Sequence, residues 1–169
     1  VFAQAVKSNA YGYTFDRSSS GLGFNDASRQ LLYVPTLNDD KVVFATPADE
    51  VAFNNFIDEQ GLSGYRGKIM PRNDLDGSWW NKFDVRVEQQ FAGFSAEHKG
   101  SFYVVLENVG NLLNDDWGIV KEGSDQTSAV TTSVNTAGQY VYKFNSPTAE
   151  NRRIDPSLWE ARIGVKYSF

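Results

Sequence analysis

The clearest hydrophobic pattern in the chain lies at its C-terminus. In residues 159–169 every odd position is apolar or aromatic, and every even position is charged, small or polar. Such period-2 alternation is typical of a β-strand with one apolar and one polar face. Residues 79–91 repeat the pattern, and only Asn81 and Gln89 interrupt the apolar face. Both segments therefore predict strands that are buried on one side only.

Two further strands are predicted from less regular patterns. Residues 101–112 begin apolar on both faces and turn polar at Glu107, whereas residues 9–16 carry Tyr11, Tyr13 and Phe15 on one face. The prediction is thus an all-β fold of antiparallel strands. The four strands are placed at about 9–16, 79–91, 101–112 and 158–169.

The connections between these strands differ greatly in length. Residues 92–100 make a short polar turn, whereas residues 17–78 and 113–157 are far longer than the loops of a compact domain. The first long connection contains a predicted helix at 47–60, with Thr46 as N-cap and Gly61 just beyond its end.

Smaller elements are also predicted within the long connections. Residues 31–34 and 42–45 are expected to pair as a hairpin, and residues 138–144 are expected to form a strand. The long connections are therefore expected to contain structure of their own.

Alternating short and long connections are typical of outer-membrane β-barrels, which have short periplasmic turns and long extracellular loops. Trp79 and Phe91, like Trp159 and Phe169, bracket their strands with aromatic rings. At a rise of roughly 3.3 Å and a tilt of about 40°, these strands span on the order of 25–30 Å. The alternative is a soluble antiparallel sheet that packs its apolar face into a core.

The amino-acid composition excludes several classes of binding site and catalytic site. The 169 residues include 12 Phe, 8 Tyr and 4 Trp, carry a net charge of −5 and contain no cysteine. A negative chain is a poor partner for nucleic acid, and His98 as the one histidine excludes a multi-imidazole zinc site. Residues 74–77 match only part of a calcium loop. Because no nucleophile, base and acid are arranged for catalysis, we expect no enzymatic activity, cofactor or metal.

Two motifs resemble a known family. Residues 107–114, ENVGNLLN, are similar to the signature that ends the penultimate strand of TonB-dependent outer-membrane transporters, and residues 157–169, SLWEARIGVKYSF, are similar to their closing strand. Most of the chain from about Tyr11 onward resembles the Oar-like subfamily. This includes LLYVP and the segment VAFNNFIDEQGLSGYRGKIMPRN, which resemble an extracellular insert.

The resemblance implies the last four strands of a 22-stranded barrel in the outer membrane of a Gram-negative bacterium. Residues 92–100 would then be periplasmic, and 17–78 and 113–157 extracellular. The implied partners are the rest of the barrel with its plug domain, the TonB complex through an upstream segment, the barrel-assembly machinery, and outer-membrane lipid with lipopolysaccharide. The implied function is ligand uptake across the outer membrane.

Three groups of candidate site residues follow. Those expected to face the lumen are Lys82, Asp84, Arg86, Glu88, Glu160, Arg162 and Lys166. Those expected in the membrane girdle and the assembly signal are Trp79, Phe91, Trp159, Tyr167 and Phe169. Candidate ligand-binding residues in the extracellular loops are Tyr65, Arg66, Trp117, Tyr140 and Tyr142.

Two other functions stay open from the sequence. The first is an outer-membrane barrel whose long surface loops serve protein interaction, adhesion or secretion rather than uptake. The second is a soluble β module that binds carbohydrate through exposed aromatic side chains. Dependence on detergent separates this last possibility from the other two.

Overall fold

The computed structural model describes residues 1–23, 25–124 and 127–169. The chain forms two compact units, each assembled from separated segments. We call Val1–Ser8, Ser78–Glu122 and Asn151–Phe169 the sheet unit. We call Asn9–Gly77 and Gly123–Glu150 the core unit.

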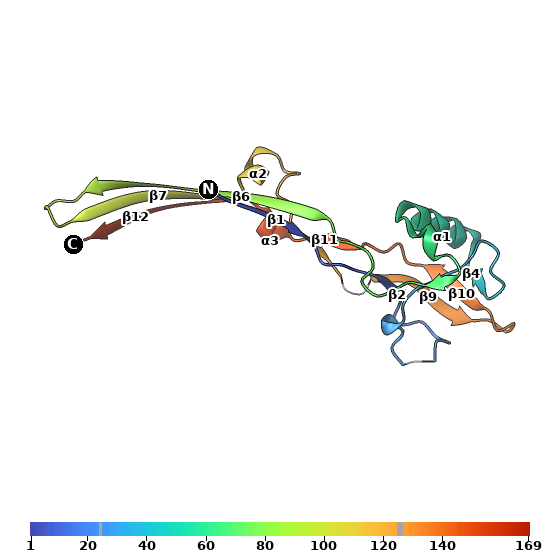
Figure 1. Ribbon diagram of the computed structural model, residues 1–169. Coiled ribbons are helices and arrows are strands. Elements are labelled where there is room, and N and C mark those ends of the chain that lie inside the picture. The colour runs from blue at the N-terminus through green and yellow to red at the C-terminus, as the bar shows by residue number, and fades with distance from the viewer. Residues whose placement is uncertain (24, 125–126) are drawn as a thin grey trace. The chain divides into compact units, whose positions relative to one another are not determined.

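The sheet unit is built on four antiparallel strands, which Figure 1 shows running side by side. In spatial order they are β1 (Phe2–Lys7), β6 (Trp79–Ala92), β7 (Lys99–Glu107) and β12 (Glu160–Ser168). The register places Val87 opposite Val104, and Val104 opposite Ile163. Because side chains alternate across a sheet, this register gathers the apolar positions of three strands on one face. Among the described residues no sheet closes on itself, since β1 pairs only with β6 and β12 only with β7.

Three of the four predicted strands correspond to β6, β7 and β12, and a strand also forms within residues 9–16, but it is shorter than predicted and belongs to a different sheet. The strand beside β6 is β1, with Ala3 opposite Phe83. Tyr13–Phe15 instead forms β2 in the core unit, where all three residues are buried. Alternating aromatics there fill a core, and period-2 alternation alone does not distinguish the two situations.

Strand β7 also ends earlier than predicted. It stops at Glu107 because Asn108 adopts a left-handed backbone with φ of 53°, after which Val109–Leu113 forms the short helix α2. The short helix α3 spans Ile154–Ser157. The strands β8 (Lys121–Gly123) and β11 (Glu150–Arg152) pair as a separate two-stranded ribbon.

The core unit contains a mixed four-stranded sheet. Its order is β2, β9 (Thr127–Val134), β10 (Tyr140–Phe144) and β4 (Val42–Phe44). The β9–β10 pair comes from the second long connection and is antiparallel; β9 pairs in parallel with β2, and β10 pairs in parallel with β4 of the first connection. The β9–β10 pair therefore lies between two strands that precede β6 in the chain.

A second, two-stranded sheet in the core unit corrects the predicted hairpin. β3 (Tyr33–Val34) pairs with β5 (Lys68–Ile69), while β4 pairs with β10. Residues 31–34 and 42–45 thus do not pair with each other. The predicted strand at 138–144 is confirmed as β10. Two 3₁₀ helices, η1 (Ala27–Arg29) and η2 (Leu62–Tyr65), complete the unit.

The predicted helix is confirmed as α1 (Pro47–Glu59). The Thr46 hydroxyl oxygen accepts a hydrogen bond of 3.1 Å from the backbone N–H of Asp49, which satisfies an otherwise unpaired donor at the helix start. Gly61 follows the helix with φ of 67°, the left-handed conformation that glycine adopts most readily. Phe53, Phe56 and Ile57 form its buried stripe.

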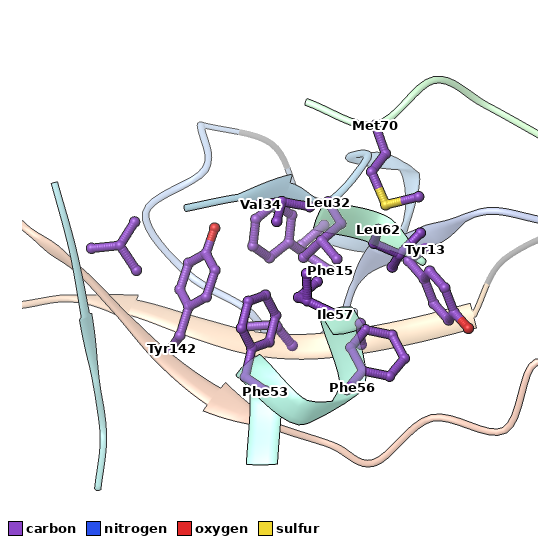
Figure 2. Packing of buried hydrophobic residues seen from close by; sticks show 14 residues of the cluster. Tyr13, Phe15, Leu32, Val34, Phe53, Phe56, Ile57, Leu62, Met70 and Tyr142 are labelled. Carbon is purple, nitrogen blue, oxygen red and sulfur yellow. The ribbon is translucent and has the colours of Figure 1, made fainter. Parts of the chain in front are cut away.

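Aromatic side chains dominate the hydrophobic core (Figure 2). Tyr142 of β10 packs on Phe53 at 6.1 Å between ring centroids, and Tyr13 of β2 packs on Phe56 at 4.8 Å, both edge to face. In the part of the chain that the structure describes, every fully buried apolar side chain belongs to the core unit. The sheet unit therefore has no apolar interior of its own.

Within residues 1–23, 25–124 and 127–169, no helix is long and apolar enough to cross a lipid bilayer.

Candidate functional site

The predicted lumen-facing residues share one face of the sheet unit, which we call the polar face. An additional residue, Glu107 at the end of β7, lies at the centre of its charges. Glu107 pairs with Lys82 of β6 at 3.9 Å and with the guanidinium of Arg162 on β12. Arg162 also contacts Glu160 at 2.7 Å. One carboxylate thus links the two strands on either side of its own.

A second group on the polar face surrounds Tyr103. The guanidinium of Arg86 lies 4.9 Å from the centre of the Tyr103 ring and donates a 2.8 Å hydrogen bond to Glu88. A Cβ at Gly164 of β12 would come within 2.3 Å of the Tyr103 ring, so the ring covers the space that a side chain would occupy. Lys166 contributes a favourable charge beside Glu88. That this face lines a barrel lumen stays a prediction.

The opposite, apolar face of the sheet unit is exposed. The exposed fraction of the side chains reaches 62% for Val87, 71% for Ile163 and 69% for Val165. The apolar face comprises Trp79, Phe83, Val85, Val87 and Phe91 of β6, Phe102, Val104 and Leu106 of β7, and Ala161, Ile163, Val165 and Tyr167 of β12. Contiguous apolar surface of this kind is typical of interaction or membrane-contact sites.

The predicted girdle residues all lie at the ends of strands and are exposed. Trp79 and Phe91 lie at opposite ends of β6, and Trp159 immediately precedes β12. At the other end of β12, Phe169 is 95% exposed. Their placement agrees with a girdle, although contact with lipid stays a prediction.

Tyr167 ties the last strand to the β6–β7 turn. Its hydroxyl accepts a 3.0 Å hydrogen bond from the backbone N–H of Phe94 and lies 2.8 Å from Nδ1 of His98. The rings of Phe94 and Tyr167 also pack at 5.9 Å. The single histidine is therefore part of a contact between the turn and the C-terminal strand.

The ENVGNLLN motif folds around a buried asparagine. The side-chain amide of Asn108 donates to the backbone carbonyls of Gly118 at 3.0 Å and Ser157 at 2.7 Å, and its backbone N–H donates to Asp84 at 2.8 Å. The residue is completely buried. Asn108 thus connects β6, the end of β7 and the segment that precedes β12.

Asn111, the second asparagine of the motif, closes the turn that follows. Its side-chain amide donates to the carbonyls of Asp115 and Trp117, both at 3.1 Å. The two asparagines therefore satisfy backbone groups of a segment that has little regular secondary structure.

The core unit contains a half-open pocket of about 390 Å³. Its lining is mainly apolar and comes from both long connections. β2 contributes Phe15, the second connection contributes Tyr140 and Tyr142, and the first contributes Leu22, Gln30, Leu31, Tyr33, Lys41, Val42, Gly67 and Ile69. Two of the predicted ligand-binding residues thus come together in one pocket.

Tyr142 is one of the residues that line this pocket and is only 1% exposed. Its hydroxyl donates to the backbone carbonyl of Tyr33 at 3.1 Å, and burial raises the pKa of Tyr142. The Tyr33 hydroxyl donates to Asp39 at 2.6 Å; this hydrogen bond, together with burial, raises the pKa of Tyr33 to about 12. Both phenols are therefore neutral at physiological pH, and Tyr142 supports the fold of the pocket as well as lining it.

The other predicted ligand-binding residues have different surroundings. The Tyr65 hydroxyl donates to Asp74, which raises the pKa of Tyr65. Arg66 donates to Asn54 at 2.8 Å and to the carbonyl of Pro35 at 3.2 Å, so its guanidinium already holds the first connection together. Trp117 is 55% exposed and belongs to the sheet unit, where it lines a second pocket of about 410 Å³ together with Phe83 and Leu113.

Sequence reasoning missed Glu107, Asn108 and Lys41 as site residues. Glu107 and Asn108 belong to the ENVGNLLN motif. The change from apolar to polar residues at Glu107 could have indicated that these two residues have a role. Nothing in the sequence around Lys41, or around its pocket neighbour Tyr33, indicated a site. The pocket forms only when two segments that are distant in the chain pack together.

Within the described ranges, no group of three or more His, Cys, Asp or Glu side chains is placed to hold a metal ion. No family model, curated protein or solved structure matches the chain.

Proposed function

We propose that the sheet unit is a section of the wall of an outer-membrane β-barrel, and that the barrel belongs to a TonB-dependent receptor that takes up a ligand. The observation that carries this proposal is the pair of unlike faces on one four-stranded sheet. One face is apolar and exposed, and the other carries ion pairs that connect three strands. Lipid on one side and water on the other would satisfy both faces.

The contrast with the core unit supports a lipid-facing surface. The chain builds a conventional core from the aromatic residues of the core unit, where Tyr13 and Phe53 are almost fully buried. In the sheet unit, Val87 and Ile163 alternate just as regularly with polar residues but are exposed. Exposure of these apolar side chains to water costs a free energy of about 25 cal/mol for each Å² of apolar surface.

The lengths of three of the four strands also fit a bilayer. β7 and β12 each have 9 residues and β6 has 14. A transmembrane strand needs about 9–11 residues when tilted. The unpaired outer edges of β1 and β12 would pair with neighbouring strands of the same barrel, because open edges are not tolerated in lipid.

In this proposal the core unit is the extracellular part that meets the ligand. The remaining partners would be the plug domain, the TonB complex, the barrel-assembly machinery, and lipid with lipopolysaccharide. We propose no enzymatic activity.

The test is the same substitution on opposite faces of the sheet. Val87→Glu adds a charge to the apolar face, whereas Val105→Glu adds it to the polar face, opposite Arg86 and Arg162 in register. We expect Val87→Glu to reduce the folded, membrane-inserted fraction of the protein that contains this chain, with a cost of roughly 1–2 kcal/mol. Val105→Glu should insert normally.

Insertion is measured by heat-modifiable mobility in gels and by protease protection in outer-membrane fractions. Equal tolerance of both variants, or a protein that stays monodisperse without detergent, would contradict the barrel. Normal insertion together with loss of an adhesion or secretion phenotype, but no loss of uptake, would favour the alternative function of the surface loops.

A further inference from the structure

The pocket of the core unit combines a mainly apolar lining with the charged side chain of Lys41. Its apolar lining includes Phe15, Leu22 and Ile69, together with the ring of Tyr142. Among the lining residues that the structure describes, Lys41 is the one with a charged side chain. With a volume of about 390 Å³, the pocket lies toward the smaller end of the range that is common for small-molecule sites.

The ammonium group of Lys41 interacts electrostatically with Asp39 but makes no direct ion pair with it. In the part of the chain that the structure describes, Lys41 forms no ion pair within 4.0 Å. The acid beside it, Asp39, already accepts hydrogen bonds from the Tyr33 hydroxyl at 2.6 Å and from the backbone N–H of Lys41 at 3.0 Å. These hydrogen bonds lower the pKa of Asp39, and the nearby positive charge of Lys41 lowers it further. The Lys41 side chain is exposed where it lines the pocket.

The aromatic rings of the pocket are held rigidly. Phe15 packs edge to face on Tyr142 at 5.7 Å, and Tyr142 is fixed through its hydrogen bond to the carbonyl of Tyr33. The partly exposed ring of Tyr140 lines the same pocket. A preformed apolar surface of this kind binds flat or branched apolar groups without the cost of ordering the side chains.

From these observations we propose that the pocket binds a small amphipathic carboxylate. Its aryl or branched aliphatic body would lie against Tyr140, Tyr142 and the aliphatic walls, and its carboxylate would pair with the ammonium of Lys41. The inference names the ligand class for the uptake proposed above and rests on that proposal for its biological role. Because residues of both long connections line the pocket, a bound ligand would also hold the two connections together.

The experiment compares two probes of nearly the same shape, one negatively charged and one neutral. The affinities of 3-phenylpropanoate and its neutral amide, 3-phenylpropanamide, are measured by ligand-observed NMR titration with the detergent-purified protein that contains this chain. We expect the carboxylate to bind about five- to tenfold more tightly than the amide, as a partly desolvated ion pair would provide.

Three variants locate the effect. Lys41→Met should reduce the affinity for the carboxylate to that for the amide, and Lys68→Met, which changes an exposed lysine outside the pocket lining, should leave both affinities unchanged. Ile69→Trp should weaken both probes by filling the pocket; Ile69 is 64% exposed, so the fold can accommodate a larger ring.

Several results would overturn the inference. They are equal affinity for the two probes, no binding of either, an equal loss in Lys68→Met and Lys41→Met, or unchanged binding in Ile69→Trp. The membrane proposal fails separately, through the insertion of Val87→Glu and Val105→Glu, because those measurements contain no ligand. Probe binding without membrane insertion would leave a binding module and remove the uptake function.

Discussion

Gly118 and Asn108 fit against each other in a way that leaves no room for a side chain at position 118. The Asn108 amide donates to the Gly118 carbonyl at 3.0 Å, and a Cβ on Gly118 would lie only 1.9 Å from the Asn108 Oδ1 atom. Gly118 also has φ of 63°. Both the backbone conformation and the close approach therefore require glycine here.

Gly118→Ala should consequently destabilise the protein more than an ordinary substitution of a left-handed glycine. We expect a loss of roughly 2–4 kcal/mol, because the new methyl group must displace Asn108 from its buried hydrogen bonds. Gly61→Ala is the matched control, with φ of 67° but open space around the missing Cβ; it should cost about 1 kcal/mol. Urea unfolding followed by far-UV circular dichroism provides both values. Similar losses would show that backbone strain alone matters.

Asn108→Asp tests the two donors of the Asn108 amide without changing the shape of the side chain. The carboxylate cannot donate to the carbonyls of Gly118 and Ser157, and it would be buried with its charge facing two oxygens. We expect a loss of about 3 kcal/mol or more at neutral pH, partly recovered on acidification as the new carboxyl group is protonated. Asn55→Asp, on the exposed side of α1, should change stability by less than about 0.5 kcal/mol. Unfolding curves at two pH values measure the difference. If Asn108→Asp were as stable as wild type, the hydrogen bonds donated by the Asn108 amide would have no role in stability.

Glu107 links three strands through Lys82 and Arg162, whereas Glu160 pairs with Arg162 on its own strand. Glu107→Gln should therefore cost about 1 kcal/mol at low salt, and Glu160→Gln should cost clearly less. The cost of Glu107→Gln should shrink as salt increases, because the pairs are partly exposed. Chemical unfolding at two salt concentrations measures both values. Equal effects of the two variants would mean that the connection between strands adds no stability.

Asp49 connects the start of α1 to β10, and this contact predicts a pH dependence. Its carboxylate accepts hydrogen bonds from the Thr46 hydroxyl at 2.6 Å and from the backbone N–H of Phe144 at 3.0 Å, and these bonds lower the pKa of Asp49. Because the folded state has the lower pKa, the stabilisation is fully present above the unfolded value of about 3.9 and is lost as the pH falls through the folded value.

The corresponding variant is Asp49→Asn. Wild type should have the higher melting temperature from neutral pH down to about pH 4, and the difference should shrink below that as wild-type Asp49 is protonated. Glu59→Gln, at the other end of the same helix, is the control for a general loss of negative charge. A difference between wild type and Asp49→Asn that stays constant from pH 7 to pH 2.5 would show that the carboxylate contributes through packing rather than charge.

Local patterns were sufficient for much of the secondary structure. The strict alternation around Val87 and Ile163 predicted β6 and β12, and Thr46 with Gly61 marked the ends of α1. These features depend on neighbours in the chain: side chains alternate along any strand, and helix caps satisfy backbone groups within one turn. The charged face of the sheet was predictable for the same reason.

Long-range pairing decided the rest. The alternation of Tyr13 and Phe15 fits either a membrane strand or a core strand, and the packing of Phe56 and Tyr142 against them made it a core strand. Likewise, Tyr33 and Lys41 meet Tyr140 only because β4 pairs with β10, about a hundred residues away. No local preference encodes such a contact, since it depends on which of several compatible strands find each other on folding.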